Sequence, residues 1–436
     1  MIRVTADRFA RLKALQRLSA PAIAGEGIRV GEQGFDRTSD LTSSSEQLAL
    51  ILGASVKRNS HGEHLSLRCW RGDPPPCAPT TAALQLLSPG APEDVVDAQR
   101  WLFLDTETTG LAGGTGTYPF LVGVAWWEGG GIEIEQLFMR EYSEERSLLA
   151  ALADRMAERP VLITFNGKSF DWPLLETRYR MTRALTVPKP LAHLDLLHPA
   201  RSLWRLRLGS VRLSQLERHV LGRDRGADLP SELIPRIYLE FVRGGRAEPL
   251  VPVFHHNQMD LCGLAGLSGR ILSLLGEEGT TSNDGLELLG LSRLYERRGE
   301  RSRARRLYEE SIAAVLPREA DRAARGALAR LAKRDGDLLR ARELWESTVG
   351  DSREGYEAYE QLAIYFEHER HQPLQALAIV QEALAELRRA KQTGTIAPAT
   401  YRNAKARFEH RLARLERKAG WPLLSEFPPT ESPAGS

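Results

Sequence analysis

The sequence has few cysteines, few lysines and no long apolar run. Its three cysteines, Cys69, Cys77 and Cys262, lack CxxC spacing, so we expect neither a disulfide framework nor a zinc site. No apolar stretch approaches the ~18 residues of a membrane span, and the charged N-terminal stretch lacks the apolar core of a signal peptide. We therefore expect a cytoplasmic protein that does not associate with membranes.

A strong net charge is also missing. Lys and Arg number 59 and Asp and Glu 57, a net charge of +2, so affinity for nucleic acid must come from a local basic surface. Only 8 of the basic residues are Lys, and the others are Arg, whose planar guanidinium suits bidentate contacts with phosphate. The apolar fraction of 42% is that of a globular protein, and 436 residues predict two or three domains.

The N-terminal region, residues 1–95, has a mixed pattern. "RFARLKALQRL" predicts a short helix and "HGEHLSLRCW" a strand of a small sheet. "RGDPPPCAPTT" predicts a linker, because consecutive prolines break both helices and central strands. The sequence assigns no chemistry to this region.

Residues 96–276 alternate between strand and helix patterns. "RWLFLDTET", "YPFLVGVAWW", "GIEIEQLFM" and "PVLITFNG" predict strands, whereas "SEERSLLAALADRMAER" and "SFDWPLLETRYRM" predict helices. This order of elements predicts an α/β domain with a mixed sheet.

Residues 285–418 predict an all-helical region with an internal repeat. Three turn positions follow one another after 37 and 35 residues, and a small residue recurs after each turn. These positions are Gly299, Gly336 and His371 for the turns and Ala304, Ala341 and Ala376 for the small residues. The spacing resembles that of tetratricopeptide repeats, about 34 residues, and the alternative is a general bundle of helical hairpins. The Pro- and Ser-rich residues 419–436 predict a disordered tail.

The segment "FLDTETTG", residues 103–110, ends an apolar strand with two acids. Asp105 and Glu107 point to one face of the strand, with backbones roughly 6–7 Å apart, because side chains alternate along a strand. Two carboxylates this close repel each other unless a divalent cation lies between them. Oxygen ligands favour Mg²⁺ or Mn²⁺ over zinc. The simpler alternative is an edge strand that ends in water.

Two later segments carry related groups. Asp171 follows "LITFNGKSF" near the expected start of a helix, where the helix dipole also favours an acid. His255 and His256 precede Asp260 by five and four residues, and His256 shares a helical face with Asp260. Histidine can accept a proton from a water nucleophile near neutral pH. Taken alone, these groups are equally consistent with a helix-start acid and a surface pair.

In combination, the order of these motifs resembles that of the DEDD exonucleases in the ribonuclease H-like superfamily. A closer resemblance, covering residues 98–275, is to the YprB-type branch. It rests on "DTETTGLAGGTGTYPFLVGVAWW", "TFNGKSFDWPLL", "HLDLLHPARSLWR" and "HHNQMDL". The resemblance implies an α/β domain with a mixed central sheet flanked by helices. It also implies a metal-dependent 3′–5′ exonuclease acting on single-stranded DNA or RNA.

By this resemblance, four carboxylates hold two Mg²⁺ or Mn²⁺ ions. In such enzymes the ions lie ~3.5–4 Å apart and contact the attacking and leaving oxygens of a phosphodiester. The four ligands are Asp105, Glu107, Asp171 and Asp260. A histidine five residues before the last Asp, here His255, acts in one subclass, and another subclass has Tyr four residues before. We favour His256 because "HNQMD" resembles the closing motif of the branch, with His255 as the alternative base.

Other residues have expected supporting roles. Asn166 is expected to bind substrate or orient Asp171, and Lys168 and Thr108 to contact nucleic acid. Asp195 is expected either to support the metal ligands or to cap the helix that follows it.

The arginine-rich segment 201–225 is a candidate surface for nucleic acid. Arg201 and Arg205 suit phosphate contacts, and Trp204 between them could stack on a base. The alternative is a solvated helix face with Trp204 in the core.

The main functional alternative is a non-catalytic scaffold that binds nucleic acid or protein through the same fold. In both cases the C-terminal helices are expected to offer a site for a protein partner. Four mutually repelling carboxylates favour the enzyme, because a scaffold has no chemical need for them.

Overall fold

The computed structural model describes residues 48–74, 78–110, 115–276, 282–349 and 356–418. The helix expected within "RFARLKALQRL" and the tail 419–436 lie outside the described residues. Within these ranges, none of the helices has both the length and the apolar character needed to span a membrane.

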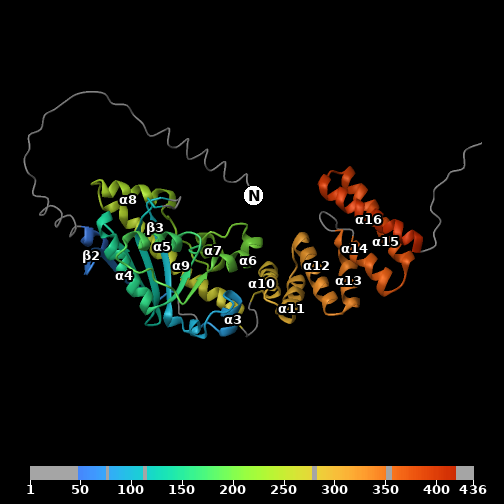
Figure 1. The fold of residues 1–436 in the computed structure, drawn as a ribbon, viewed down its shortest axis with the longest axis horizontal. Coiled ribbons are helices and arrows are strands. Elements are labelled where there is room, and N and C mark those ends of the chain that lie inside the picture. Colours follow the sequence, from blue (N-terminus) through green and yellow to red (C-terminus); the bar gives the residue numbers. More distant parts are fainter. Residues whose placement is uncertain (1–47, 75–77, 111–114, 277–281, 350–355, 419–436) are drawn as a thin grey trace, which may run out of the picture. The chain divides into compact units, whose positions relative to one another are not determined.

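A seven-stranded mixed sheet forms the centre of the α/β part, in the order β1-β2-β5-β4-β3-β6-β7 (Figure 1). The strands are β1 (Ser55–Asn59), β2 (Gly62–Arg71), β3 (Trp101–Thr108), β4 (Pro119–Glu128), β5 (Gly131–Phe138), β6 (Val161–Thr164) and β7 (Ala192–Asp195). β6 pairs in parallel with β3 and β7, and the other neighbours pair antiparallel. The predicted mixed sheet is therefore confirmed.

The sheet extends further towards the N-terminus than predicted. "HGEHLSLRCW" forms most of β2, which pairs with β5 from Leu65–Phe138 to Arg71–Ile132. It belongs to the central sheet and not to a separate small sheet, so that expectation is wrong. The boundary placed near residue 95 therefore does not separate two sheets.

Helices cover both faces of this sheet, and the alternation of side chains along β3 shows why (Figure 1). Trp101 and Phe103 join one apolar cluster, while Leu102 and Leu104 join another on the opposite face. The helices of this part are α3 (Thr81–Leu87), α4 (Glu145–Glu158), α5 (Asp171–Thr182), α6 (Leu197–Leu208), α7 (Leu213–Val220), α8 (Ile234–Val242) and α9 (Val251–Leu275). The long helix α9 contacts β3, β4 and β5 and contributes to both clusters.

The C-terminal part is helical, as predicted. Its helices are α10 (Gly285–Arg297), α11 (Arg301–Ala313), α12 (Arg318–Arg334), α13 (Leu338–Thr348), α14 (Glu357–Ile364) with a π-helical turn (Tyr365–Glu369), α15 (Pro373–Gln392) and α16 (Pro398–Lys418). All three predicted turn positions have left-handed backbones, with φ of 85° at Gly299, 81° at Gly336 and 54° at His371. The small residues that follow them are fully buried. Assignment as tetratricopeptide repeats stays a prediction.

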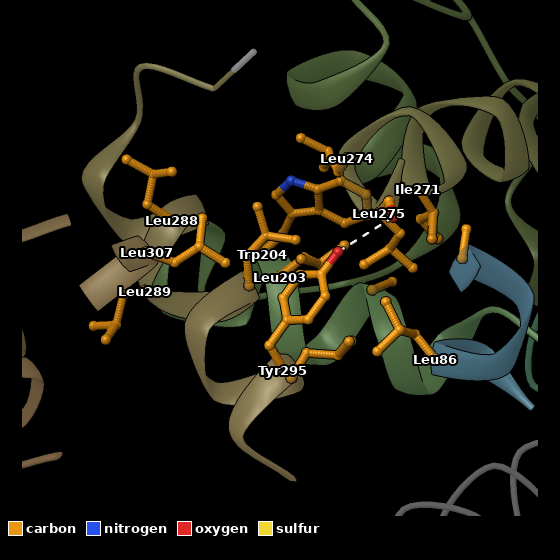
Figure 2. Packing of buried hydrophobic residues seen from close by; sticks show 14 of the residues in the cluster. Leu86, Leu203, Trp204, Ile271, Leu274, Leu275, Leu288, Leu289, Tyr295 and Leu307 are labelled. Atoms are coloured by element: carbon orange, nitrogen blue, oxygen red, sulfur yellow. Dashed lines mark hydrogen bonds between the residues drawn. The ribbon is translucent and has the colours of Figure 1, made fainter. Parts of the chain in front are cut away.

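Helix α10 packs directly on α6, so the first helical hairpin shares a core with the α/β part (Figure 2). Leu203 and Trp204 of α6 lie in one cluster with Leu288 and Leu289 of α10. The two backbones approach closely at Gly290, where a Cβ would lie 2.5 Å from the Ser202 carbonyl oxygen. Glycine at this position therefore permits the contact.

Candidate active site

Four acids from three elements converge at one end of β3. Asp105 and Glu107 lie on β3, Asp171 is the first residue of α5, and Asp260 lies on α9. Burial raises the pKa of Asp105 well above its usual range, and the charges of Asp260, Glu107 and Asp171 raise it further. Burial likewise raises the pKa of Glu107, with Asp260 and Asp171 adding to the effect. The three elements thus bring the four acids together in one cluster of carboxylates.

Asp171 is held in place by the strand that carries the first two acids. The Thr106 hydroxyl donates a hydrogen bond of 2.5 Å to Asp171 Oδ1. Burial still raises the pKa of Asp171, although this hydrogen bond acts to lower it. Asn166, which we expected to orient Asp171, lies half-buried in the loop before α5.

Helix α9 brings His256, rather than His255, to the acids. Ligand atoms of Glu107, His256 and Asp260 all lie within 4.8 Å of one another. His256 Nε2 is 3.4 Å from Asp260 Oδ2, one helical turn further on. His255 is exposed, because successive helix residues are turned by about 100°. The helix geometry therefore places His256, and not His255, beside these acids, and its role as the base stays a prediction.

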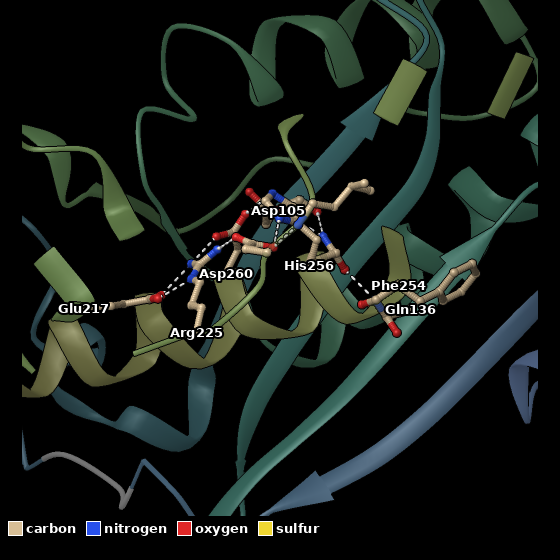
Figure 3. Close-up of polar contacts among 10 residues, drawn as sticks. Asp105, Gln136, Glu217, Arg225, Phe254, His256 and Asp260 are labelled. Carbon is tan, nitrogen blue, oxygen red and sulfur yellow. Dashed lines mark hydrogen bonds and ion pairs between the residues drawn. The ribbon is translucent and has the colours of Figure 1, made fainter. Parts of the chain in front are cut away.

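A chain of amides supports Asp105 from below the site (Figure 3). Asn257 Nδ2 donates to Asp105 Oδ2 at 2.8 Å. Gln136 Nε2 of β5 in turn donates to Asn257 Oδ1 at 2.8 Å and to the Phe254 carbonyl at 2.9 Å. Gly123, the β4 partner of Asp105, leaves room for this chain, since a Cβ there would lie 2.1 Å from Asn257 Oδ1.

The loop between α7 and α8 adds two charged residues that sequence reasoning did not place here. Arg225 donates to Asp260, to Asp228 and to both carboxylate oxygens of Glu217 (Figure 3). Asp228 Oδ1 lies 2.7 Å from His256 Nδ1. Burial raises the pKa of Glu217, against the opposing effect of Arg225. The only sequence signal for this loop was its place in the arginine-rich segment.

Asp195 holds the loop that leads to Asp171. It ends β7, and its carboxylate accepts hydrogen bonds from the backbone N–H groups of Asn166 at 2.8 Å, Lys168 at 3.1 Å and Leu197 at 3.0 Å. Asn166 has a left-handed backbone with φ of 70°. Asp195 therefore holds the loop before Asp171 and accepts from the first N–H of α6, although the N-cap residue of that helix is Leu196. Its support of the metal ligands stays a prediction.

Four of the residues expected to contact nucleic acid stay candidates for that role. Lys168, Arg201 and Arg205 have exposed side chains. Thr108 is half-buried, and its hydroxyl donates to the Gly110 carbonyl at 2.8 Å. Their contacts with substrate stay predictions.

Trp204 does not fit its expected role. Its side chain is 0% exposed, and its indole N–H donates to Glu287 of α10 at 2.6 Å. Figure 2 shows the ring inside the apolar cluster between α6 and α10. A ring enclosed in this way cannot stack on a nucleic-acid base, so the alternative of a core residue is correct.

The side chains at this site suit a hard divalent cation. Asp105, Glu107, Asp171 and Asp260 offer carboxylate oxygens, which Mg²⁺ and Mn²⁺ prefer. Burial raises the pKa values of Asp105 and Glu107, the charges of the neighbouring acids raise them further, and a bound cation would offset both effects. Arg225 is the positive group that contacts Asp260 in this structure.

Comparison with known proteins agrees with this fold. The chain matches the family model described as the RNase_H superfamily over residues 102–271. The protein YprB of Bacillus subtilis (strain 168) is 30% identical over 317 residues, which cover 72% of this chain and 74% of that protein. Among solved structures, the family B DNA polymerase from the hyperthermophilic archaeon Pyrobaculum calidifontis is 15% identical. That match has a TM-score of 0.34 and covers 45% of this chain and 29% of the polymerase chain. A similarity this weak supports no conclusion about the fold or function of this chain.

The sheet, the converging acids and the family match define a ribonuclease H superfamily domain. More narrowly, the chain belongs to the same family as YprB. The expected resemblance of the α/β part is thereby confirmed.

Proposed function

We propose that this protein is a metal-dependent nuclease, specifically a 3′–5′ exonuclease that hydrolyses phosphodiester bonds of single-stranded DNA or RNA. The ribonuclease H superfamily consists mainly of nucleases, which supports a hydrolase acting on nucleic acid. The observation that carries the proposal is the convergence of four carboxylates and His256 at the end of β3. The direction of cleavage rests on the resemblance to DEDD exonucleases.

In this proposal Asp105, Glu107, Asp171 and Asp260 hold two Mg²⁺ or Mn²⁺ ions. When bound, such ions supply charge stabilisation to the reacting phosphodiester and orient the attacking water. His256 accepts the proton of that water through Nε2, the ring nitrogen that faces Asp260. Asn257 and Gln136 fix the Asp105 carboxylate, so the ligand does not have to be ordered when a cation binds.

The substrate strand would be held by residues around this site. Lys168 lies three residues before Asp171 and is exposed, so it is placed to meet a phosphate. Arg201 and Arg205 are exposed on α6 and would add sequence-independent affinity. A protein partner would bind the C-terminal helices, and the cytoplasmic location stays a prediction.

A non-catalytic scaffold is the second candidate, and the site counts against it. Desolvating several carboxylates together is unfavourable, as the raised pKa values of Asp105 and Glu107 show. The Gln136–Asn257 chain additionally holds Asp105 in one orientation. Binding to nucleic acid alone requires neither feature.

The experiment is a cleavage assay on the full chain with 3′- or 5′-labelled single-stranded DNA and RNA. Reactions contain Mn²⁺, Mg²⁺ or EDTA. Asp105→Asn removes one proposed ligand, and Asp154→Asn, at an exposed acid of α4, is the matched control. We expect metal-dependent shortening from the 3′ end in the wild type and the control, but not in Asp105→Asn. Absence of cleavage of both polymers with either metal would overturn the proposal in favour of the scaffold.

A further inference from the structure

The loop between α7 and α8 contacts the candidate base from the side opposite the acids. Asp228 Oδ1 lies 2.7 Å from His256 Nδ1, while His256 Nε2 faces Asp260 at 3.4 Å. Arg225 joins the two carboxylates, donating to Asp228 Oδ2 at 3.1 Å and to Asp260 Oδ1. The four side chains thus form a closed ring of charged and hydrogen-bonded groups.

The direction of the hydrogen bond between Asp228 and His256 follows from the charge of Asp228. A carboxylic acid is ordinarily ionised near neutral pH, and the Arg225 guanidinium, which donates to Asp228 Oδ2 at 3.1 Å, favours the ionised form. An ionised carboxylate only accepts hydrogen bonds. His256 must therefore donate through Nδ1–H, and in the neutral form of the ring the Nε2 lone pair points towards Asp260.

We infer that Asp228 is a positioning residue that holds His256 in the Nδ1–H tautomer, and that Arg225 fixes Asp228 in the orientation this requires. Carboxylates that bind one imidazole nitrogen are a general means of setting the tautomer and ring orientation of the other. The kinetic part of this inference rests on the proposed nuclease function. The tautomer itself does not depend on it.

Arg225 suits this role because it cannot lose its charge and is nearly enclosed. Its side chain is 8% exposed, and it donates to Glu217, Asp228 and Asp260 together. The guanidinium stays protonated at any physiological pH, so Asp228 always faces a positive charge. Arg225 also occupies Asp260 Oδ1, which leaves Oδ2 as the oxygen that faces His256.

In the proposed proton transfer, His256 takes up the proton of the attacking water and Asp228 stabilises the charge that results. The O–H bond of the attacking water breaks, its proton forms a bond with Nε2 of His256, and the oxygen keeps the electron pair for attack on phosphorus. The imidazolium that results carries a positive charge beside Asp228, whose carboxylate stabilises it without taking the proton. Without Asp228, the neutral ring could carry its proton on Nε2, where it cannot accept another.

The first test measures the tautomer of His256 and needs no activity. Nitrogen NMR of the full chain with ¹⁵N-labelled histidine, with the signal assigned through His256→Gln, reports which ring nitrogen is protonated. In Asp228→Asn, Arg225 can donate only to the amide oxygen, so the amide N–H faces Nδ1 and forces the Nε2–H form. Asp224→Asn is the matched control, because this neighbouring acid accepts only from the Gly226 N–H at 3.0 Å among its described hydrogen bonds.

We expect Nδ1–H in the wild type and the control, and a shift to Nε2–H in Asp228→Asn. An Nε2–H ring in the wild type, or an unchanged tautomer in Asp228→Asn, would overturn the inference. If the wild type cleaves no nucleic acid, the proposed function fails, and the NMR result still decides the role of Asp228.

The second test is a kinetic double-mutant cycle. Asp228→Asn is expected to lower kcat by about 100-fold or more with little change in KM, as for loss of a correctly oriented general base. In a His256→Ala background the same substitution should have almost no further effect, because the group it positions is already gone. An equal loss in both backgrounds would show a structural role for Asp228 and contradict positioning.

Discussion

The substitution Gly123→Ala probes the packing that orients Asp105. A Cβ at this position would lie 2.1 Å from Asn257 Oδ1 and 2.8 Å from its Cγ, so the Asn257 side chain must move. Overpacking of this kind costs about 1–3 kcal/mol. Loss of the buried hydrogen bonds from Gln136 and to Asp105 costs about 1–3 kcal/mol more. The gain from replacing Gly by Ala in a strand, about 0.5–1 kcal/mol, offsets part of this.

We therefore expect Gly123→Ala to lower the free energy of unfolding by about 2–4 kcal/mol. In an Asn257→Ala background the clashing amide is absent, so the same substitution should be close to neutral. Urea unfolding followed by tryptophan fluorescence, in EDTA, measures all four corners of this cycle. A cost of several kcal/mol in both backgrounds would refute the idea that Gly123 is required because of Asn257.

Other predictions concern the acids, the core of α6 and its surface. The pKa values of Asp105 and Glu107 are raised in the folded state, so the fold favours their protonated forms. The stability that this provides is fully present below about pH 4, the pKa of the unfolded acids, and is lost as pH rises through the raised folded-state values. Asp105→Asn should hence raise the Tm of the EDTA-treated chain at pH 7.5 but not near pH 4, and Mn²⁺ should raise the Tm of the wild type more than that of the variant. Trp204→Phe should lower the free energy of unfolding by about 1–3 kcal/mol, because the buried carboxylate of Glu287 loses a hydrogen-bond donor. The same variant should bind single-stranded DNA as tightly as the wild type. Arg201→Gln and Arg205→Gln should each reduce the salt dependence of that binding by about one unit of slope, with stability within about 0.5 kcal/mol of wild type. Fluorescence anisotropy at several salt concentrations checks both binding predictions. If the two arginine variants show the same salt dependence as the wild type, α6 does not contact the nucleic acid.

The acids could be predicted from sequence because each lies within or at the start of a strongly patterned element. The apolar run before Asp105 and Glu107 forms β3, and Asp171 begins α5 as expected. The preference for His256 came from the resemblance of "HNQMD" to the closing motif of the branch, and the structure places His256 on the Asp260 face of α9. Local periodicity placed these residues on their elements, and the resemblance to the family grouped them into one predicted site.

The supporting groups of the site could not be predicted in this way. Gln136, Asn257 and Asp228 reach the site only through the pairing of β5, β4 and β3 and the docking of α9 and a loop. Their partners are 28 to 152 residues away in sequence, so no local pattern indicates them.

Two errors have the same physical origin. An aromatic residue between arginines has the same local pattern on a nucleic-acid surface and in a core, and Trp204 is buried because α10 packs on α6. The strand "HGEHLSLRCW" likewise gives no indication of its partner, and it joins the central sheet through β5. Long-range packing decided both cases.

The most direct measurement of the central claim, that these carboxylates form a metal centre, is anomalous diffraction from crystals of the full chain soaked in Mn²⁺. We predict anomalous peaks in contact with Asp105, Glu107, Asp171 and Asp260, and their loss in Asp105→Asn. Mn²⁺ bound only at other surfaces, with Asp260 still paired with Arg225, would contradict the metal centre and the nuclease proposed from it.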